Sequence, residues 1–184
     1  MIDQKNNDLY GFNAAAILQL GWKNRGKIVQ KQSGGSLPLV AYILEVGNKN
    51  KATIKQKKAG NAALVALIGD QNKWDVYQDG FNNTAGVVVF GDHNHGSVTQ
   101  NGDNHFSMQM VMGLYNNGLI NQMGWSNIAT QILGGTHNMG TITQSGWMNV
   151  ATQTLVGNWG TGIINQVMGP NWATQTQSGD HNMA

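Results

Sequence analysis

Two groups of acidic and imidazole side chains are the first candidates for chemistry in this sequence. Asp92-His93-Asn94-His95 and Asp103-Asn104-His105 carry groups that bind divalent metals or act as general acids and bases. Both groups follow a glycine, one unit of eleven residues apart, and Asp and Asn are favoured at turns for conformational reasons. No nucleophile–base pair, phosphate loop or dinucleotide fingerprint accompanies them. We therefore expect no catalytic residue, no cofactor and no dedicated metal site, with adventitious ion binding at these turns as the alternative.

The spacing of these turns belongs to a repeat that occupies most of the chain. Steps of eleven from Gly47 to Gly179 give 13 positions, of which eleven are Gly, and the position three residues later is Asn in eleven of the 13 units. Two residues further on stands a small residue, except at Trp74. Gly and Asn supply turn geometry and the residues between them alternate, so each unit predicts one short strand and one tight turn. Eleven residues are too few for a strand plus a helix, which excludes helical solenoids.

The inward positions of the strands come in two alternating kinds. One kind is small–aliphatic–Gln, as in Gly140, Ile142 and Gln144, and the other is small–Gln–aliphatic, as in Ala151, Gln153 and Leu155. The full repeat is therefore two units of eleven, a 22-residue rung, and it predicts an all-β solenoid of stacked strand–turn–strand rungs with amyloid-like cross-β order. Folding the two kinds face to face is expected to bring Gly140 opposite Leu155, Gln144 opposite Ala151 and Ile142 against Gln153, so that large side chains meet small ones.

Stacking rungs about 4.8 Å apart would place the amide side chains in columns, where each amide bonds to the next and is not left buried without a partner. We expect structural Gln ladders in the core and structural Asn ladders at the turns; solvated surface is the alternative for these residues. The Gln ladders comprise Gln56, Gln78, Gln100, Gln122, Gln144 and Gln166 in one column and Gln109, Gln131, Gln153 and Gln175 in another. The Asn ladders comprise Asn50, Asn61, Asn72, Asn83, Asn94, Asn116, Asn127, Asn138, Asn149, Asn171 and Asn182.

Three parts of the chain differ in regularity. Residues 1–9 are expected to form a leader segment, residues 10–46 irregular repeats with an insertion at 31–35, and residues 47–184 the regular array. The composition (11% charged, 25 Gly, no Cys) fits either a stacked repeat or a disordered prion-like chain, and the unbroken register favours the repeat. The start of the chain lacks the apolar segment of a signal peptide, so an exported protein would be present here in its mature form.

Charge is divided unevenly along the chain. All eleven Lys and Arg residues lie between Lys5 and Lys73, and only acidic charges follow. A basic segment can indicate nucleic-acid binding, but here the cations follow the repeat, so we expect no nucleic-acid partner. No apolar run is long enough to span a membrane.

The motif Gln144-Ser-Gly146-Trp-Met-Asn149-Val-Ala151 resembles the curlin repeat of bacterial curli subunits. The resemblance covers roughly residues 10–184 and departs from the family pattern where alternate units end in an aliphatic residue, as at Leu155. It implies secretion through an outer-membrane pore, a nucleator subunit as partner, and polymerisation into extracellular fibres that serve biofilm matrix and adhesion. Head-to-tail stacking is expected from the charge division, because it sets a basic end against an acidic one. We expect the major subunit of such a fibre, with the nucleator as the alternative.

Two further alternatives concern the outer surface. Thr130, Thr152/Thr154 and Thr174/Thr176 form a short outward threonine ladder of the kind that a monomeric ice- or polysaccharide-binding solenoid would use. Trp125 and Trp147 occupy the same repeat position and are expected to lie at an exposed edge, as packed aromatics or as a contact surface. The open final unit, Gly179–Ala184, favours polymerisation over a monomeric solenoid, because monomeric solenoids cover their ends with atypical repeats.

Overall fold

The chain forms sixteen β-strands, and the computed structural model describes residues 1–6 and 13–184. The predicted unit containing Tyr10 falls partly outside these residues. In chain order the strands are β1 (Ile2–Asn6), β2 (Asn13–Leu20), β3 (Arg25–Gln32), β4 (Leu39–Val46), β5 (Lys51–Lys57), β6 (Ala62–Ile68), β7 (Lys73–Asp79), β8 (Thr84–Asp92), β9 (His95–Asp103), β10 (Phe106–Leu114), β11 (Asn117–Trp125), β12 (Ile128–Thr136), β13 (Met139–Trp147), β14 (Val150–Asn158), β15 (Thr161–Val167) and β16 (Trp172–Ser178).

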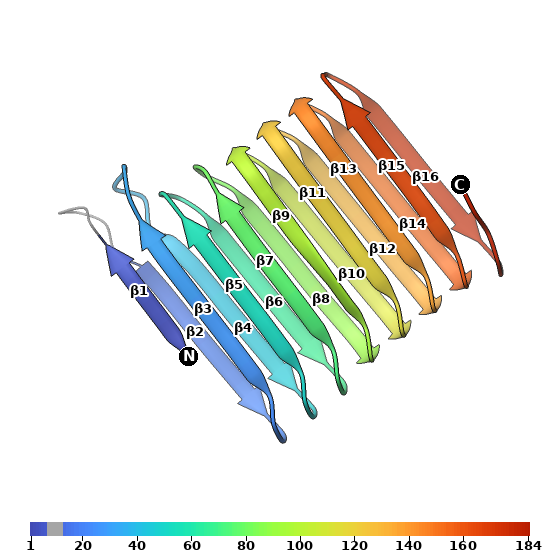
Figure 1. Cartoon of the computed structure of the whole chain (residues 1–184), viewed down its shortest axis with the longest axis horizontal. Helices are drawn as coiled ribbons and strands as arrows, with labels where there is room; N and C mark the ends of the chain where they lie inside the picture. Colours follow the sequence, from blue (N-terminus) through green and yellow to red (C-terminus); the bar gives the residue numbers. More distant parts are fainter. Residues whose placement is uncertain (7–12) are drawn as a thin grey trace.

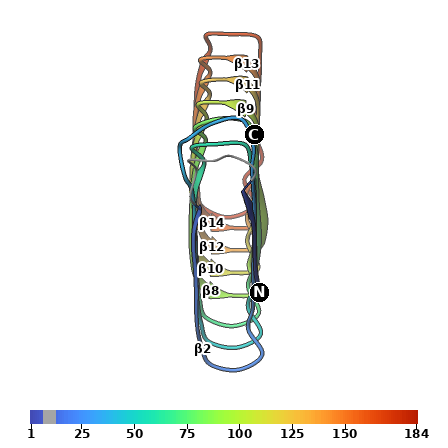
Figure 2. The same ribbon diagram turned by 90° about the vertical axis from the view of Figure 1, so that its left-hand side faces the viewer.

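The strands make two parallel eight-stranded sheets that face each other. Odd-numbered strands follow one another in one sheet (the odd sheet) and even-numbered strands in the other (the even sheet), as Figure 1 shows. One odd strand and the following even strand form a rung, and the rungs are flattened in outline, with a turn at each end (Figure 2). Hydrogen-bonded neighbours such as Gln56 and Gln78 are 22 positions apart, which confirms the predicted all-β solenoid and the length of its rung.

The turns explain why glycine recurs every eleven residues. Gly135 has a φ of 104°, in a region that L-residues avoid, and a Cβ there would lie 2.0 Å from the carbonyl oxygen of Gly157 in the next rung. Two residues after the turn glycine stands a non-glycine residue in the left-handed region, as at His137 with a φ of 57°. Stacking therefore favours glycine at the first position, and the two units that hold Lys58 or Met168 there have a different turn backbone.

The first rungs are longer than the rest. β1 pairs with β3, and β3 with β5, at a separation of 26 residues, whereas β5 and β7 are separated by 22. Residues 31 and 32 were expected to lie in the insertion at 31–35, but they form the end of β3. The longer connection occupies residues 33–38. There Gln32 Nε2 donates to the carbonyl oxygens of Gly35 (2.8 Å) and Leu37 (3.0 Å).

The core is a thin layer between the sheets. Small, aliphatic and amide side chains at alternate positions point into it, as in β13, where Gly140, Ile142 and Gln144 are buried. The expected pairing of Gly140 with Leu155 is wrong. A Cβ at Gly140 would lie 2.8 Å from Leu133 and 2.5 Å from Gln153 Oε1, and it is Gly162 that approaches Leu155. The cause is the rise of the chain along each rung, which sets an odd strand between two even strands (Figure 1).

Candidate functional site: amide columns through the solenoid

One column of glutamines runs through the interior along the odd sheet. Seven hydrogen bonds of 2.6–2.9 Å join Nε2 of each glutamine to Oε1 of the next. From Gln30 to Gln166, the amide nitrogen also donates across the core to a carbonyl oxygen of the even sheet, as from Gln56 to Val40 (2.9 Å) and from Gln144 to Ile128 (2.9 Å). We call this set the through column; its members are Gln4, Gln30, Gln56, Gln78, Gln100, Gln122, Gln144 and Gln166.

Sequence reasoning left Gln4 and Gln30 out of this column. Both precede their neighbour by 26 residues, so a count in steps of 22 from Gln56 misses them. Gln30 follows Asn24 and Gly26 at the spacing of the repeat, and this spacing could have identified Gln30 as a member of the column. Because each bond is directional, the column presents acceptor oxygen at Gln4 and donor nitrogen at Gln166.

A second glutamine column occupies only the C-terminal half of the even sheet. Gln109, Gln131, Gln153 and Gln175 are joined by Nε2–Oε1 bonds of 2.9, 2.8 and 2.6 Å. The column begins at Trp74, whose Nε1 donates to Gln109 Oε1 (2.8 Å). Trp74 was the exception among the small residues; it is completely buried because Gly96 leaves space for its ring. Its indole N–H therefore satisfies the acceptor with which the column starts.

The asparagines form two columns, one at each row of turns. From Asn50 to Asn149, Oδ1 accepts the backbone N–H of the residue 22 positions later, as from Asn94 to Asn72 (3.0 Å), and Nδ2 donates to a backbone carbonyl oxygen, as from Asn94 to Gly113 (2.8 Å). Asn50 to Asn149 are buried in these columns, Asn182 is half-buried and Asn171 is exposed in the last rung. The bonds restrain both turns in every rung, which explains the constant spacing between Gly and Asn along this chain.

His105 replaces an asparagine in one of these columns. Its Nδ1 accepts the backbone N–H of Asn127 (3.2 Å), and its own backbone N–H donates to Asn83 Oδ1 (2.9 Å). An Nδ1 that accepts must be unprotonated, and burial lowers the pKa of the His105 imidazole. The imidazole thus serves as a structural acceptor, and a metal-binding role for it would break the column.

Three other imidazoles lie in a stack of rings, whereas His95 begins β9 and is exposed. His93, Tyr115, His137, Trp159 and His181 stack at one row of turns, with successive centroids 4.8, 4.9, 4.0 and 6.4 Å apart. Sequence reasoning missed this stack, because the corresponding position in earlier rungs holds Lys or Gln. Trp125 and Trp147 are paired in register at the opposite row of turns, and each is 47% exposed. Within residues 1–6 and 13–184, no group of three or more His, Asp or Glu side chains is placed to hold a metal ion.

A protein-family model matches part of the sequence that forms these columns. Residues 69–102 match the model of the curlin associated repeat. The chain contains curlin repeats. The matched segment covers β7, β8 and most of β9, and the 22-residue register of the even sheet continues unchanged from β8 to β16. No curated protein matches the sequence, and the described part of the chain contains no helix that could cross a membrane.

Proposed function

We propose that this chain is the structural subunit of an extracellular curli-type fibre and that it polymerises head-to-tail. The observation that carries the proposal is that both ends of the solenoid are open in the same register. Among the described residues, β1 and β2 form the outermost strands at one end of the two sheets, and β16 together with the part of β15 that follows Ile163 forms the open edge at the other. A second copy can therefore extend both sheets without any change of fold.

The amide columns match across such a junction. The C-terminal end presents Gln166, Gln177 and Asn182, and the N-terminal end presents Gln4, Gln19 and Asn24 at the corresponding repeat positions. Gln177 and Gln19 are of special interest, because the rungs between them hold Glu45 or aliphatic residues at this core position. Inside the chain, Gln19 Nε2 donates to Glu45, and the equivalent amide pair between Gln177 and Gln19 forms only between two copies.

The partial strands at the two ends also fit. Thr161 of β15 pairs with Met183, and Ile163 N–H donates to Ala184 (3.0 Å), so the C-terminal tail covers the first part of β15. β1 covers a later part of its own neighbour, beginning where Ile2 pairs with Ile28, the position that Ile164 holds in β15. The pairing positions of a following copy's β1 and of this tail on β15 therefore do not overlap.

The curlin repeats support a structural role, and the extracellular location, the biofilm and adhesion roles, the secretion pore and the nucleator partner follow from the resemblance. The regular C-terminal rungs favour the major subunit. A monomeric surface-reading solenoid remains the second candidate, since Thr130, Thr152 and Thr174 are stacked in register on the even sheet. That candidate requires a stable monomer.

Fibre formation by the purified chain tests the proposal. We expect unbranched fibres with a meridional reflection near about 4.7–4.8 Å. Gln177→Leu should slow elongation because a following copy's Gln19 loses its partner, whereas Thr176→Leu, which changes the neighbouring outward residue, should not. A chain that stays monomeric at high concentration, or fibres whose growth ignores Gln177→Leu, would contradict head-to-tail stacking.

A further inference from the structure

The outer faces of the two sheets differ sharply in charge. The strands of the odd sheet carry eight of the eleven Lys and Arg residues, including Lys27, Lys55 and Lys73. In the described residues, the strands of the even sheet contain two charged side chains: Glu45 points into the core, and Asp92 ends β8 at a turn. The outer face of the even sheet therefore has no charged side chain along the body of its strands.

This uncharged face is rich in exposed apolar side chains. Tyr42, Leu64, Phe90, Phe106, Met108 and Ile128 are 39–47% exposed on it. Exposed apolar patches of several hundred Å² on a soluble protein mark interaction surfaces. We call this surface the even face.

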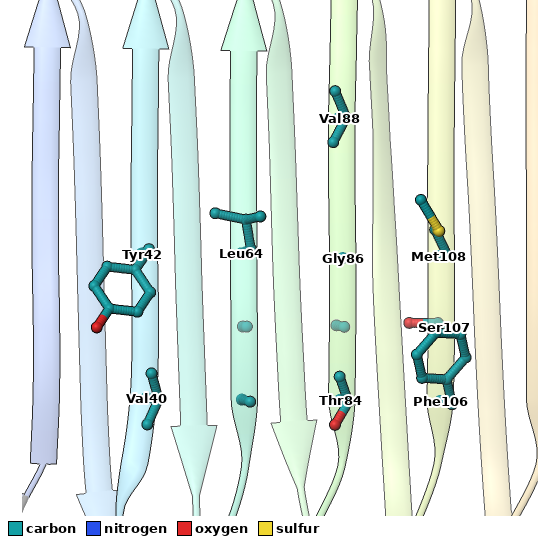
Figure 3. Close-up of a pocket in the computed structure, with 12 residues that line it drawn as sticks. Val40, Tyr42, Leu64, Thr84, Gly86, Val88, Phe106, Ser107 and Met108 are labelled. Carbon is teal, nitrogen blue, oxygen red and sulfur yellow. The ribbon is translucent and has the colours of Figure 1, made fainter.

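A hollow lies in the even face. Tyr42, Leu64, Gly86 and Met108 occupy one column across β4, β6, β8 and β10, and Figure 3 shows Gly86 without a side chain between Leu64 and Met108. A Cβ at Gly86 would meet no atom within 4 Å. The resulting apolar depression measures about 400 Å³, with Val40, Val88 and Phe106 also on its border.

We propose that the even face is where two curli-type filaments of this chain pair, even sheet against even sheet, with an apolar side chain of each filament seated in the Gly86 hollow of the other. This inference rests on the proposed function, because it takes the filament as given. It adds the surface through which filaments associate side by side.

Three arguments favour a second filament as the occupant. Eight strands spaced about 4.8 Å apart, each of seven to nine residues, present roughly 1,000 Å² per copy, compared with about 800 Å² per partner in a stable protein interface. A filament of the same chain has the same rise per strand, so its contacts stay in register along the whole length, as in paired sheets of cross-β structures. Pairing through the odd faces would instead bring the cationic strands of both filaments together.

Mass per length of the fibres measures the pairing directly. A chain of 19.8 kDa in eight rungs gives about 5 kDa per nm for one filament and about 10 kDa per nm for a pair. We expect the wild-type chain to give the higher value. The double variant Leu64→Lys/Met108→Lys should form fibres with the same spacing of about 4.8 Å but with the mass per length of single filaments.

The matched control lies on the odd sheet. Leu119 (40% exposed) and Met139 (46%) resemble Leu64 (43%) and Met108 (39%) in type and exposure, so Leu119→Lys/Met139→Lys adds the same charge to the opposite face. This control should remain paired. Gly86→Leu, whose side chain has room in its own chain, should also give single filaments because it fills the hollow.

Each other outcome has a definite meaning. Wild-type fibres of about 5 kDa per nm, or pairing lost in the control and retained in the even-face variant, would overturn the inference and leave the fibre itself intact. Loss of binding to lipid vesicles or apolar beads in the even-face variant, with unchanged mass per length, would overturn it in favour of surface adhesion. A chain that forms no fibres at all would contradict the proposed function instead. Pairing that survives Gly86→Leu would refute the role of the hollow.

Discussion

The N-terminal and C-terminal halves of the solenoid share one backbone but differ in one column of the core. On the even sheet, Ile17, Ile43, Val65 and Val87 hold the column in β2 to β8, and glutamines hold it from Gln109 onward. The through column is present in both halves. The rung therefore tolerates either an aliphatic or an amide column on the even sheet, whereas the through column on the odd sheet is constant.

The halves also differ in how their buried polar groups are satisfied. In the C-terminal half, each interior amide of the second column finds a partner in the next rung, and Trp74 satisfies the first. In the N-terminal half, Glu45 accepts a hydrogen bond from Gln19 at one carboxylate oxygen, but its buried Oε1 has no hydrogen-bond partner. A buried polar group is tolerated cheaply when it repeats and is costly when it stands alone.

The largest effect is expected from breaking the column that both halves share. Gln122→Ala plus Gln144→Ala removes two amides and leaves Gln100 Nε2 and Gln166 Oε1 without their partners. At about 1–3 kcal/mol for each unsatisfied buried group, fibre formation should slow at least tenfold. The lag and growth phases can be followed by light scattering, with Thr141→Ala, an outward change between the two sites, as the control. Similar slowing in the control would mean that the facing of the strands is assigned wrongly.

The next effect concerns the boundary between the halves. Trp74→Phe preserves most of the ring but removes the N–H that satisfies Gln109 Oε1, which should destabilise the fibre by about 1–3 kcal/mol. The guanidinium concentration that dissolves half of the fibre mass should fall. Trp147→Phe, at an exposed turn, should leave that concentration unchanged. Equal midpoints for the two variants would show that the second column does not need its Trp74 cap.

Most of the strands, turns and core amides could be predicted from the sequence, because the backbone allows few residue types at the positions that recur. Glycine is required where a Cβ would strike the next turn, and the amides recur because each bonds to its copy one rung later. Counting residues therefore located the strands and turns from Gly47 onward. Counting failed at β1 and β3, where a separation of 26 residues between paired strands shifts the register while the packing stays the same.

Contacts between the two sheets and between residues of different types could not be read from the sequence. The approach of Gly140 to Leu133 depends on the rise of the chain within one rung, which the spacing of eleven does not reveal. The hydrogen bond from Trp74 to Gln109 joins residues 35 apart, a separation that matches neither the unit nor the rung. The ring stack joins His, Tyr and Trp, which share planarity but no simple sequence pattern.

The stability of the two halves should depend on pH in opposite directions, through Glu45 in the N-terminal half and His105 at the start of the C-terminal half. Burial raises the pKa of the Glu45 carboxyl, so the folded state binds its proton more tightly than the unfolded chain does. This contribution to stability is fully present below the ordinary pKa of 4.5 and is lost as the pH rises through the raised value. Burial lowers the pKa of His105, so its contribution is present above the ordinary value of 6.5 and is lost as the pH falls through the lowered value.

Two substitutions can isolate these responses. Glu45→Gln should raise the stability of the fibre at neutral pH, and His105→Asn should remove part of the stability loss on acidification, because both supply an amide that is uncharged at every pH. Guanidinium midpoints between pH 4 and 8 would measure both, with the exposed His95→Asn as the control. An unchanged pH profile in His105→Asn would mean that the column accepts a protonated imidazole.

The smallest effect should come from the charge difference between the two ends. Asp180 lies in the last rung, and head-to-tail stacking would bring a following copy's Lys23 within about one rung of it. Exposed pairs of this kind contribute less than about 1 kcal/mol, and salt screens them within about 10 Å at 0.1 M. Asp180→Asn keeps the Oδ1 that accepts Asn158 N–H, so it removes charge without removing the turn contact. Elongation from labelled seeds should slow by less than about fivefold at low salt and not at all at high salt.

Asp92→Asn makes the same change in the middle of the solenoid, where the corresponding Oδ1 accepts Asp70 N–H, and should not alter the rate. Equal slowing by both variants, or slowing that persists at high salt, would exclude an electrostatic contribution at the junction, and growth would then depend on backbone pairing and amide columns alone.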